Sequence, residues 1–133
     1  MLQHSLSRTE LLIGKDALDK LAKSKVMVFG VGGVGSFTVE ALARAGVGNL
    51  ILVDDDTVCL TNLNRQIHAT YKTISKNKVE VMKERVLSVN RNCNVNGHIG
   101  IGIFINAPTA IRAAKIPQSI LFFTLLFIRS LLL

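Results

Sequence analysis

The sequence predicts an α/β fold in which helices pack on a parallel β-sheet, and three observations support this prediction. An apolar run at residues 26–29 ends in a turn with G-x-G-x-x-G spacing. A second apolar run, Leu50–Val53, ends in Asp54. The residues between the two runs have the composition of a helix, and a crossover helix returns the chain in the same direction. Strand, glycine turn, helix, strand and acid in this order are typical of a Rossmann-like nucleotide-binding domain.

The segment before the glycine turn is expected to contain two short helices and one strand. Residues 9–23 place their leucines on one side and are interrupted by Gly14, which predicts two helical pieces. Lys25–Phe29 is a β-rich, largely apolar run followed by turn glycines, and it predicts a buried strand.

The helix after the glycine turn is expected at Ser36–Ala45, with Gly46 as its C-terminal stop. Its inward-facing side chains are predicted to be Phe37, Ala41 and Leu42. A third helix is predicted at Asn77–Val89, because its apolar residues recur at i, i+3 and i+7. Asn94–Ile99 is expected to begin a third strand.

The glycine turn predicts a site for the phosphates of a nucleotide. Gly30 allows a tight exit from the strand, Gly32 lets the backbone approach a phosphate, and Gly35 lets the helix pack closely on the sheet. The N-terminus of that helix adds free N–H groups and a partial positive charge. Asp54 follows Gly35 by 19 residues and is placed to accept hydrogen bonds from ribose hydroxyls.

The polar segment from Asp54 to His68 favours ATP over NAD as the nucleotide. A site for ATP must neutralise a triphosphate, and Arg65 and Lys78 supply two cations for that purpose. Asn62 is expected to form hydrogen bonds with phosphate or sugar oxygens. The simpler alternative is a solvated loop with a local ion pair between Asp56 and Arg65.

Three sequence blocks together resemble a known family. GVGGVGS at residues 30–36, ILVDDD at residues 51–56 and TNLNRQIH at residues 61–68 resemble the ubiquitin-activating-enzyme-like family of the ThiF/MoeB type. The last block, together with SRTELLIG at residues 7–14, is most similar to the branch that dehydrates threonylcarbamoyladenosine on tRNA. The resemblance extends from residue 5 to about residue 97.

This resemblance implies a Rossmann-like homodimer that adenylates a carboxylate with ATP and magnesium. In the dehydratase branch the carboxylate belongs to threonylcarbamoyladenosine on tRNA, and the acyl-adenylate closes into a ring with loss of AMP. Other branches act with sulfur-carrier or sulfur-donor proteins, and the sequence leaves that alternative open. The implied residues are Gly30, Gly32, Gly33 and Gly35 at the phosphates, Asp54 at the ribose, Arg65 and Lys78 as catalytic residues at the triphosphate, Asn62 nearby, and Arg8 reaching a partner subunit's site. Asp56 is predicted to be a further nucleotide contact.

The chain departs from the family pattern in two places. The family usually has Gly and Pro shortly before the lysine, where this chain has Ser75 and Asn77. There is also no Asp or Glu after Glu84, so the metal ligands stay unassigned. The missing acid and the basic charge keep open an inactive nucleotide-binding fragment that serves as an RNA- or partner-binding remnant. An NAD-binding module also stays open, because the glycines and Asp54 fit NAD equally well.

Composition divides the chain at about residue 98. Residues 1–98, expected to form the nucleotide-binding domain, contain 13 basic and 9 acidic side chains, whereas residues 99–133 contain 3 basic and no acidic ones. The apolar tail 99–133 is interpreted as a truncated or frame-shifted end that leaves the fold incomplete, and a membrane anchor there is the less favoured interpretation. Two cysteines without metal or disulfide spacing suit a reducing cytoplasm. Cys59 is expected to be a small buried side chain, and His68 to form one backbone hydrogen bond rather than act in catalysis.

Overall fold

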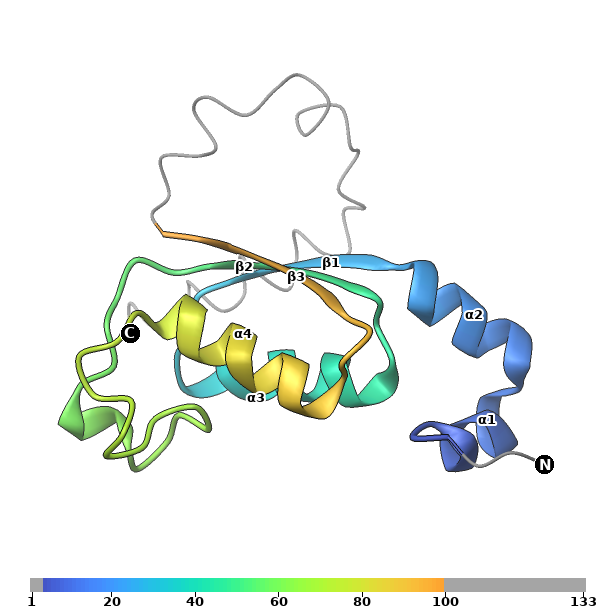
Figure 1. Ribbon diagram of the computed structural model, residues 1–133, viewed down its shortest axis with the longest axis horizontal. Helices are drawn as coiled ribbons and strands as arrows, with labels where there is room; N and C mark the ends of the chain where they lie inside the picture. Colours follow the sequence, from blue (N-terminus) through green and yellow to red (C-terminus); the bar gives the residue numbers. More distant parts are fainter. Residues whose placement is uncertain (1–3, 100–133) are drawn as a thin grey trace, which may run out of the picture. The chain divides into compact units, whose positions relative to one another are not determined.

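The computed structural model describes residues 4–99, and in that range the sheet has three parallel strands in the order β1-β2-β3. The strands are β1 (Lys25–Phe29), β2 (Asn49–Val53) and β3 (Asn94–His98). Their register places Phe29 beside Val53 and Val53 beside His98, so all three strands end at the same edge of the sheet. The fold is Rossmann-like, and the three predicted strands are confirmed (Figure 1).

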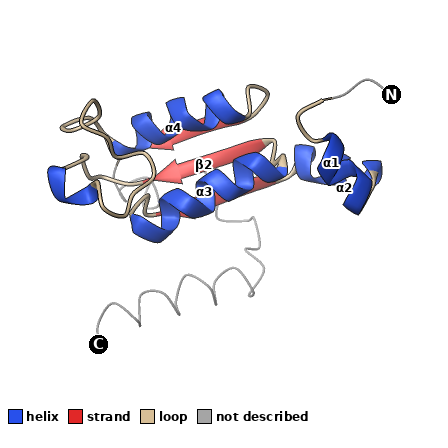
Figure 2. Ribbon diagram, turned by 90° about the horizontal axis from the view of Figure 1, so that it is seen from below, coloured by secondary structure: helices blue, strands red, loops and turns tan. Residues whose placement is uncertain are grey.

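Two helices cover one face of this sheet. α3 (Gly33–Ala45) follows β1, and α4 (Lys78–Val89) precedes β3. The two helices lie side by side along the strands, below them in Figure 1 and in front of them in Figure 2. The core between helices and sheet is made of small and medium apolar side chains, among them Val28, Val39, Leu50, Leu52, Val79, Met82, Val86 and Val95. The amphipathic pattern predicted for the third helix is therefore confirmed.

The start and the inward face of α3 differ from the prediction. The helix begins at Gly33, inside the glycine turn, rather than at Ser36. Phe37 is 52% exposed and Ala41 is exposed as well. The buried positions are Ser36, Val39, Glu40 and Ala43. Leu42, the third residue predicted to face inward, is partly buried and packs against the core. The buried stripe has ordinary helical spacing but includes a serine and a glutamate, so hydrophobicity indicated the inward face only in part.

The burial of β1 is lower than the sequence predicted. Val28 is its one buried residue, and Phe29 is 43% exposed. The reason is the position of β1, which is an outer strand of the described sheet and has β2 as its neighbour on one side. The apolar run therefore predicted the strand correctly and its burial incorrectly.

Two short helices, α1 (Ser7–Ile13) and α2 (Lys15–Lys23), precede the sheet and are separated at Gly14, as predicted. Figure 1 shows them near the edge at which the strands begin. Among the described residues, no helix combines the length and the apolar character needed to cross a membrane. The apolar tail predicted from residue 99 lies, beyond its first residue, outside the described residues.

Candidate nucleotide-binding site

The glycine turn leaves β1 sharply and brings the start of α3 against the turn itself. Gly30 has φ +80°, in the left-handed region that favours glycine, and its N–H donates to the Val53 carbonyl at 2.8 Å. At Gly35, a Cβ would lie 1.8 Å from the carbonyl oxygen of Gly30. A side chain at Gly35 would therefore push the helix off the turn, which agrees with the packing role predicted for this glycine.

Asp54 joins the end of β2 to the glycine turn. Its Oδ2 accepts a hydrogen bond from the Val31 N–H at 2.6 Å, and its Oδ1 accepts one from the Asp56 N–H at 2.8 Å. These two bonds fix the carboxylate at the shared edge of the sheet. Each carboxylate oxygen accepts more than one hydrogen bond, so Asp54 retains acceptor capacity for the hydroxyl groups of a ligand.

Lys78 lies at the start of α4 and points toward the same edge. Its Nζ is 2.6 Å from Asp56 Oδ2, in an ion pair whose lysine side chain is 6% exposed and whose aspartate side chain is 65% exposed. An antiparallel bridge between Thr57 and Asn77 brings the two segments together. The predicted alternative of an ion pair between Asp56 and Arg65 is wrong, because this bridge places Lys78 beside Asp56.

Arg65, in the polar segment that follows β2, packs against the glycine turn. A Cβ at Gly33 would be 3.6 Å from Arg65 Cγ and Cδ, which is ordinary van der Waals contact. The Arg65 guanidinium is at the surface, where Nη1 donates to the Thr61 carbonyl at 2.9 Å and to Asn64 Oδ1 at 3.1 Å. The structure thus brings both predicted cations, Arg65 and Lys78, to the residues that surround the glycine turn.

Asn62 helps to form a short turn of 3₁₀ helix, η1 (Leu60–Asn62). Its side chain is buried, and Oδ1 accepts a hydrogen bond from the Cys59 N–H at 3.1 Å. The same turn places Cys59 at the surface, so the prediction of a buried cysteine is wrong. A hydrogen bond with Thr61 lowers the pKa of the Cys59 thiol.

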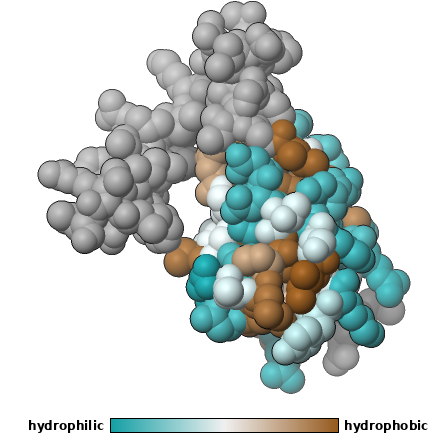
Figure 3. Space-filling model, turned by 90° about the vertical axis from the view of Figure 1, so that its left-hand side faces the viewer, coloured by the Kyte–Doolittle hydropathy of each residue, from teal (hydrophilic) through white to brown (hydrophobic). Residues whose placement is uncertain are grey.

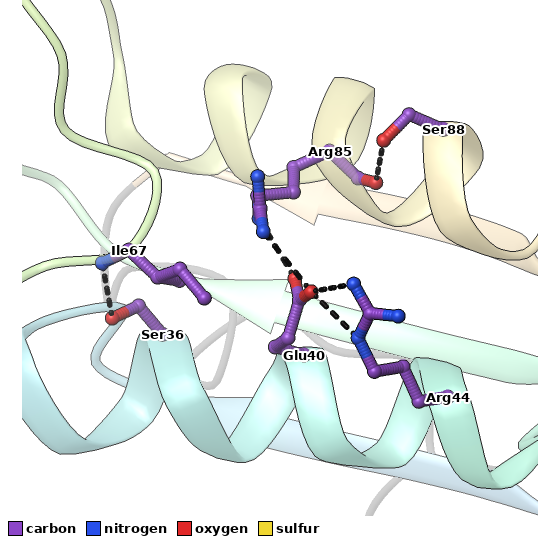
Figure 4. A network of polar contacts seen from close by, with 6 residues as sticks. All are labelled: Ser36, Glu40, Arg44, Ile67, Arg85 and Ser88. Carbon is purple, nitrogen blue, oxygen red and sulfur yellow. Dashed lines mark hydrogen bonds and ion pairs between the residues drawn. The ribbon is translucent and has the colours of Figure 1, made fainter.

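A buried ion-pair network connects the two helices that support the site. Glu40 of α3 accepts hydrogen bonds from Arg85 of α4, at 2.8 Å from Nε and 3.1 Å from Nη2, and from Arg44 Nε at 2.9 Å (Figure 4). Burial raises the pKa of Glu40, but the two arginines outweigh burial, so the pKa of this carboxyl is lowered overall. This network was not predicted from the sequence. Its signal is the position of Glu40 on the helical stripe that it shares with Ser36, Val39 and Ala43.

The polar segment is attached to α3 at its first turn. Ser36 Oγ accepts a hydrogen bond from the Ile67 N–H at 3.4 Å (Figure 4). On either side of Ile67, Gln66 and His68 are buried, and Gln66 Oε1 and both ring nitrogens of His68 have no hydrogen-bond partner among the described residues. The backbone hydrogen bond expected for the His68 ring is therefore absent there. Burial lowers the pKa of His68, and the nearby charge of Lys78 lowers it further while Asp54 opposes the shift.

The edge of the sheet around these residues also has apolar surface. Figure 3 views this edge and shows apolar side chains gathered among hydrophilic ones. Exposed apolar side chains on the elements that end or begin here include Phe29, Val34 and Leu60. A surface that combines apolar area with fixed polar groups suits a ligand that has both a base and phosphates.

Arg8 and the metal ligands are the two parts of the predicted site that the structure does not assemble. Arg8 is exposed and belongs to α1. Figure 1 shows α1 near the edge where the strands begin, at the other end of the strands from the glycine turn. The carboxylates of Asp54, Asp55 and Asp56 lie within 4.8 Å of one another. In the free protein two of these carboxylates are already engaged, Asp54 by two backbone N–H groups and Asp56 by Lys78, so the cluster is not assigned as a magnesium site.

Ser75 adopts a backbone conformation that favours glycine. Its φ is +70°, and its N–H donates to the Val58 carbonyl at 2.8 Å. This is one of the two positions at which the sequence departs from the expected pattern before the lysine. The substitution leaves the backbone path to Lys78 intact, at the cost of a strained residue.

Comparisons with known proteins agree with this geometry. The sequence model of the ThiF family matches residues 6–100. The chain is 54% identical over 92 residues to the tRNA threonylcarbamoyladenosine dehydratase of Bacillus subtilis, a match that covers 69% of this chain and 36% of that protein. It is 44% identical over 78 residues to the sulfur carrier protein ThiS adenylyltransferase of Escherichia coli, with 59% of this chain and 31% of that protein covered.

A solved structure shows the same fold. The crystal structure of Escherichia coli tRNA N6-threonylcarbamoyladenosine dehydratase in complex with ATP superposes with a TM-score of 0.73 at 38% identity, covering 78% of this chain and 45% of that one. The chain spans about a third of the length of the curated relatives it matches, at 36% and 31% in the two cases above.

Proposed function

The chain belongs to the ThiF family, and we propose that it forms the ATP-binding part of an enzyme that adenylates a carboxylate. The observation that supports this most directly is a continuous series of contacts at one edge of the sheet. It runs from the Val31 N–H in the glycine turn through Asp54 and Asp56 to the Lys78 ammonium. This series supports the assignment of Asp54 as a ribose acceptor and of Lys78 as a buried cation for the phosphates.

In the proposed reaction, a carboxylate oxygen of the substrate attacks the α-phosphorus of ATP. The bond to the bridging oxygen breaks, pyrophosphate leaves with the electron pair, and an acyl-adenylate forms. Arg65 and Lys78 stabilise negative charge on the phosphates, and Asp54 orients the ribose. The N–H groups at the start of α3 add a further favourable field for the phosphates.

We propose threonylcarbamoyladenosine on tRNA as the carboxylate substrate. The support is the 54% identity to a dehydratase of that substrate, against 44% to an adenylyltransferase of a sulfur carrier protein. After adenylation, a nucleophilic atom of the same modified side chain attacks the acyl carbon, a ring closes and AMP leaves. The sulfur-carrier reaction shares the first step and differs in the acceptor.

We further propose that the whole enzyme works as a cytoplasmic homodimer of the ligase type. In such a dimer the exposed Arg8 is available to a partner's site, because its helix α1 lies away from the glycine turn of its own chain (Figure 1). Magnesium is expected to accompany ATP, but the described residues assign it no ligands. Sedimentation of the chain tests the dimer, and loss of ATP affinity in Arg8→Ala only under dimeric conditions tests the role of Arg8.

Calorimetric titration of the chain with ATP and with NAD tests nucleotide binding. We expect ATP to bind more tightly, and Asp54→Ala to weaken it by about 1.5–3 kcal/mol through loss of hydrogen bonds to a charged acceptor. Asp55→Ala is the matched control, because Asp55 lies next in the chain and forms no hydrogen bond or ion pair within residues 4–99. Equal or tighter binding of NAD would refute the ATP assignment.

Pyrophosphate exchange into ATP tests the acceptor. The assay compares tRNA carrying threonylcarbamoyladenosine with a sulfur carrier protein that ends in a free carboxylate. Exchange that depends on the tRNA supports the dehydratase assignment, and exchange that depends on the carrier protein replaces it. ATP binding without exchange in either case would leave the chain as a nucleotide-binding fragment.

A further inference from the structure

The ion pair between Asp56 and Lys78 is unevenly buried, and this asymmetry suggests a function. Lys78 keeps 6% of its side-chain surface exposed, whereas Asp56 keeps 65%. The ammonium is therefore fixed inside the site, while the carboxylate reaches it from solvent. A pair of this kind opens by rotation of the aspartate, because the exposed partner regains water and the buried partner does not have to move.

We infer that Asp56 is a positioning residue that holds the Lys78 ammonium in the free protein and releases it to the phosphate chain of ATP. The inference rests on the proposed function, and it changes the role predicted for Asp56 from a nucleotide contact to a competitor of the nucleotide. Phosphate oxygens and a carboxylate are alternative partners for one ammonium, and two like charges beside it repel each other. Binding of the triphosphate therefore displaces the carboxylate.

The backbone allows this exchange without a change of fold. Lys78 N–H donates to the Asp56 carbonyl at 3.1 Å, and Val58 N–H donates to the Lys76 carbonyl at 2.8 Å. These bonds hold the two segments together independently of the side-chain pair. The Asp56 N–H also donates to Asp54 Oδ1, so the residue stays in place when its carboxylate turns away.

The resulting prediction is that loss of the Asp56 charge has opposite effects on stability and on ATP affinity. Without Asp56, the ammonium of Lys78 is buried with no charged partner, which destabilises the free protein. ATP no longer has to displace a carboxylate, so its affinity rises, by about 3- to 10-fold for a partly exposed ion pair and its repulsion of the phosphates. A residue with a purely structural role would lower stability without raising affinity.

The experiment measures ATP and AMP binding by calorimetry, and thermal unfolding, for the wild type, Asp56→Asn, Asp56→Glu and Asp55→Asn. We expect Asp56→Asn to unfold at lower temperature and to bind ATP about 3- to 10-fold more tightly, with a smaller gain for AMP because AMP has fewer phosphate charges. Asp56→Glu restores the charge and should bind ATP nearly as the wild type does. Asp55→Asn removes the same charge one residue away and should change ATP affinity less than Asp56→Asn.

Two results overturn the inference in different ways. If the wild type binds ATP and Asp56→Asn binds it equally or more weakly, release by Asp56 is refuted while the proposed function stands. If the wild type does not bind ATP, both are refuted. Should Asp56→Asn fail to fold, the side-chain carboxyl ¹³C resonance of Asp56 in the wild type decides, because it must shift on ATP binding, and an unchanged resonance refutes release.

Discussion

Substitution of Gly35 and Gly32 by alanine separates the two tasks of the glycine turn. A Cβ at Gly35 would lie 1.8 Å from the Gly30 carbonyl oxygen, and real Cβ atoms essentially never come closer than 3.0 Å to such an atom. The turn must therefore open by at least 3.0 − 1.8 = 1.2 Å. The atom in the way belongs to the backbone, so a change of side-chain rotamer does not relieve the contact.

The expected cost of Gly35→Ala lies at the upper end of overpacking effects, about 3 kcal/mol. For a domain of about 100 residues this corresponds to a fall in Tm of roughly 12–24 °C. Gly32 is the matched control, because a Cβ there meets nothing within 4 Å and its φ of −86° lies outside the left-handed region that favours glycine. Gly32→Ala should lower stability by less than about 1 kcal/mol, since it replaces glycine in open space.

The order of the two variants should be reversed for ATP affinity, with the larger loss in folded Gly32→Ala. The added methyl group of Gly32→Ala blocks the approach of a phosphate to the backbone and removes one hydrogen bond to a charged group, at about 1.5–3 kcal/mol or roughly 10- to 100-fold in Kd. Calorimetric unfolding and ATP titration measure both quantities. A Gly35→Ala protein with the Tm of the wild type would refute the packing argument, and unchanged ATP affinity in Gly32→Ala would refute the phosphate contact.

Three further changes test the surroundings of the site. Arg85→Ala should cost about 2–3 kcal/mol in urea unfolding because it removes two hydrogen bonds to the buried Glu40 and leaves it with Arg44 alone. Arg44→Ala should cost less, because the Arg44 side chain is 60% exposed and Arg85 still pairs with Glu40; equal costs would contradict this account of the network. Because burial lowers the folded-state pKa of His68, the free energy of unfolding should fall as pH drops below about 6.5, by at most about 1.4 kcal/mol per pH unit. His68→Phe should remove this part of the pH dependence. A stability–pH profile of His68→Phe parallel to that of the wild type would refute the role of His68. Ser75→Gly should stabilise the chain by about 1 kcal/mol because it relieves φ +70°, and a loss of stability would show that the conformation is not strained.

The order of the elements was predictable from sequence because most of them have a local signal. The i, i+3, i+7 pattern of Val79, Met82 and Val86 identified α4, and all three residues are buried. The left-handed conformation of Gly46 ends α3, as a glycine at that position predicts. β1 and β2 were recognised as short apolar runs with turn residues behind them, and their parallel direction followed from the crossover helix between them. β3, with the sequence NVNGH, has no such apolar signal.

Partners and burial were less predictable, as the polar segment shows. Cys59 was expected to be buried and is exposed, while His68 was expected to form a backbone hydrogen bond and has both ring nitrogens unpaired in the described part of the chain. Neither residue has a local sequence pattern that determines whether its side chain is buried. The 3₁₀ turn places Cys59 at the surface, and the hydrogen bond of Ile67 to Ser36 accompanies the burial of His68.

The sequence by itself determined the chemistry available at the edge of the sheet: a glycine turn, an acid after the next strand and two cations farther along. These features depend on residue type and on spacing within one element or between neighbouring elements. Only the tertiary structure decided that Asp56 pairs with Lys78 rather than with Arg65, and that Glu40 faces inward. Those choices depend on contacts between segments that are distant in the chain, and the free energy of such contacts is set by packing and desolvation, which spacing along the sequence does not encode.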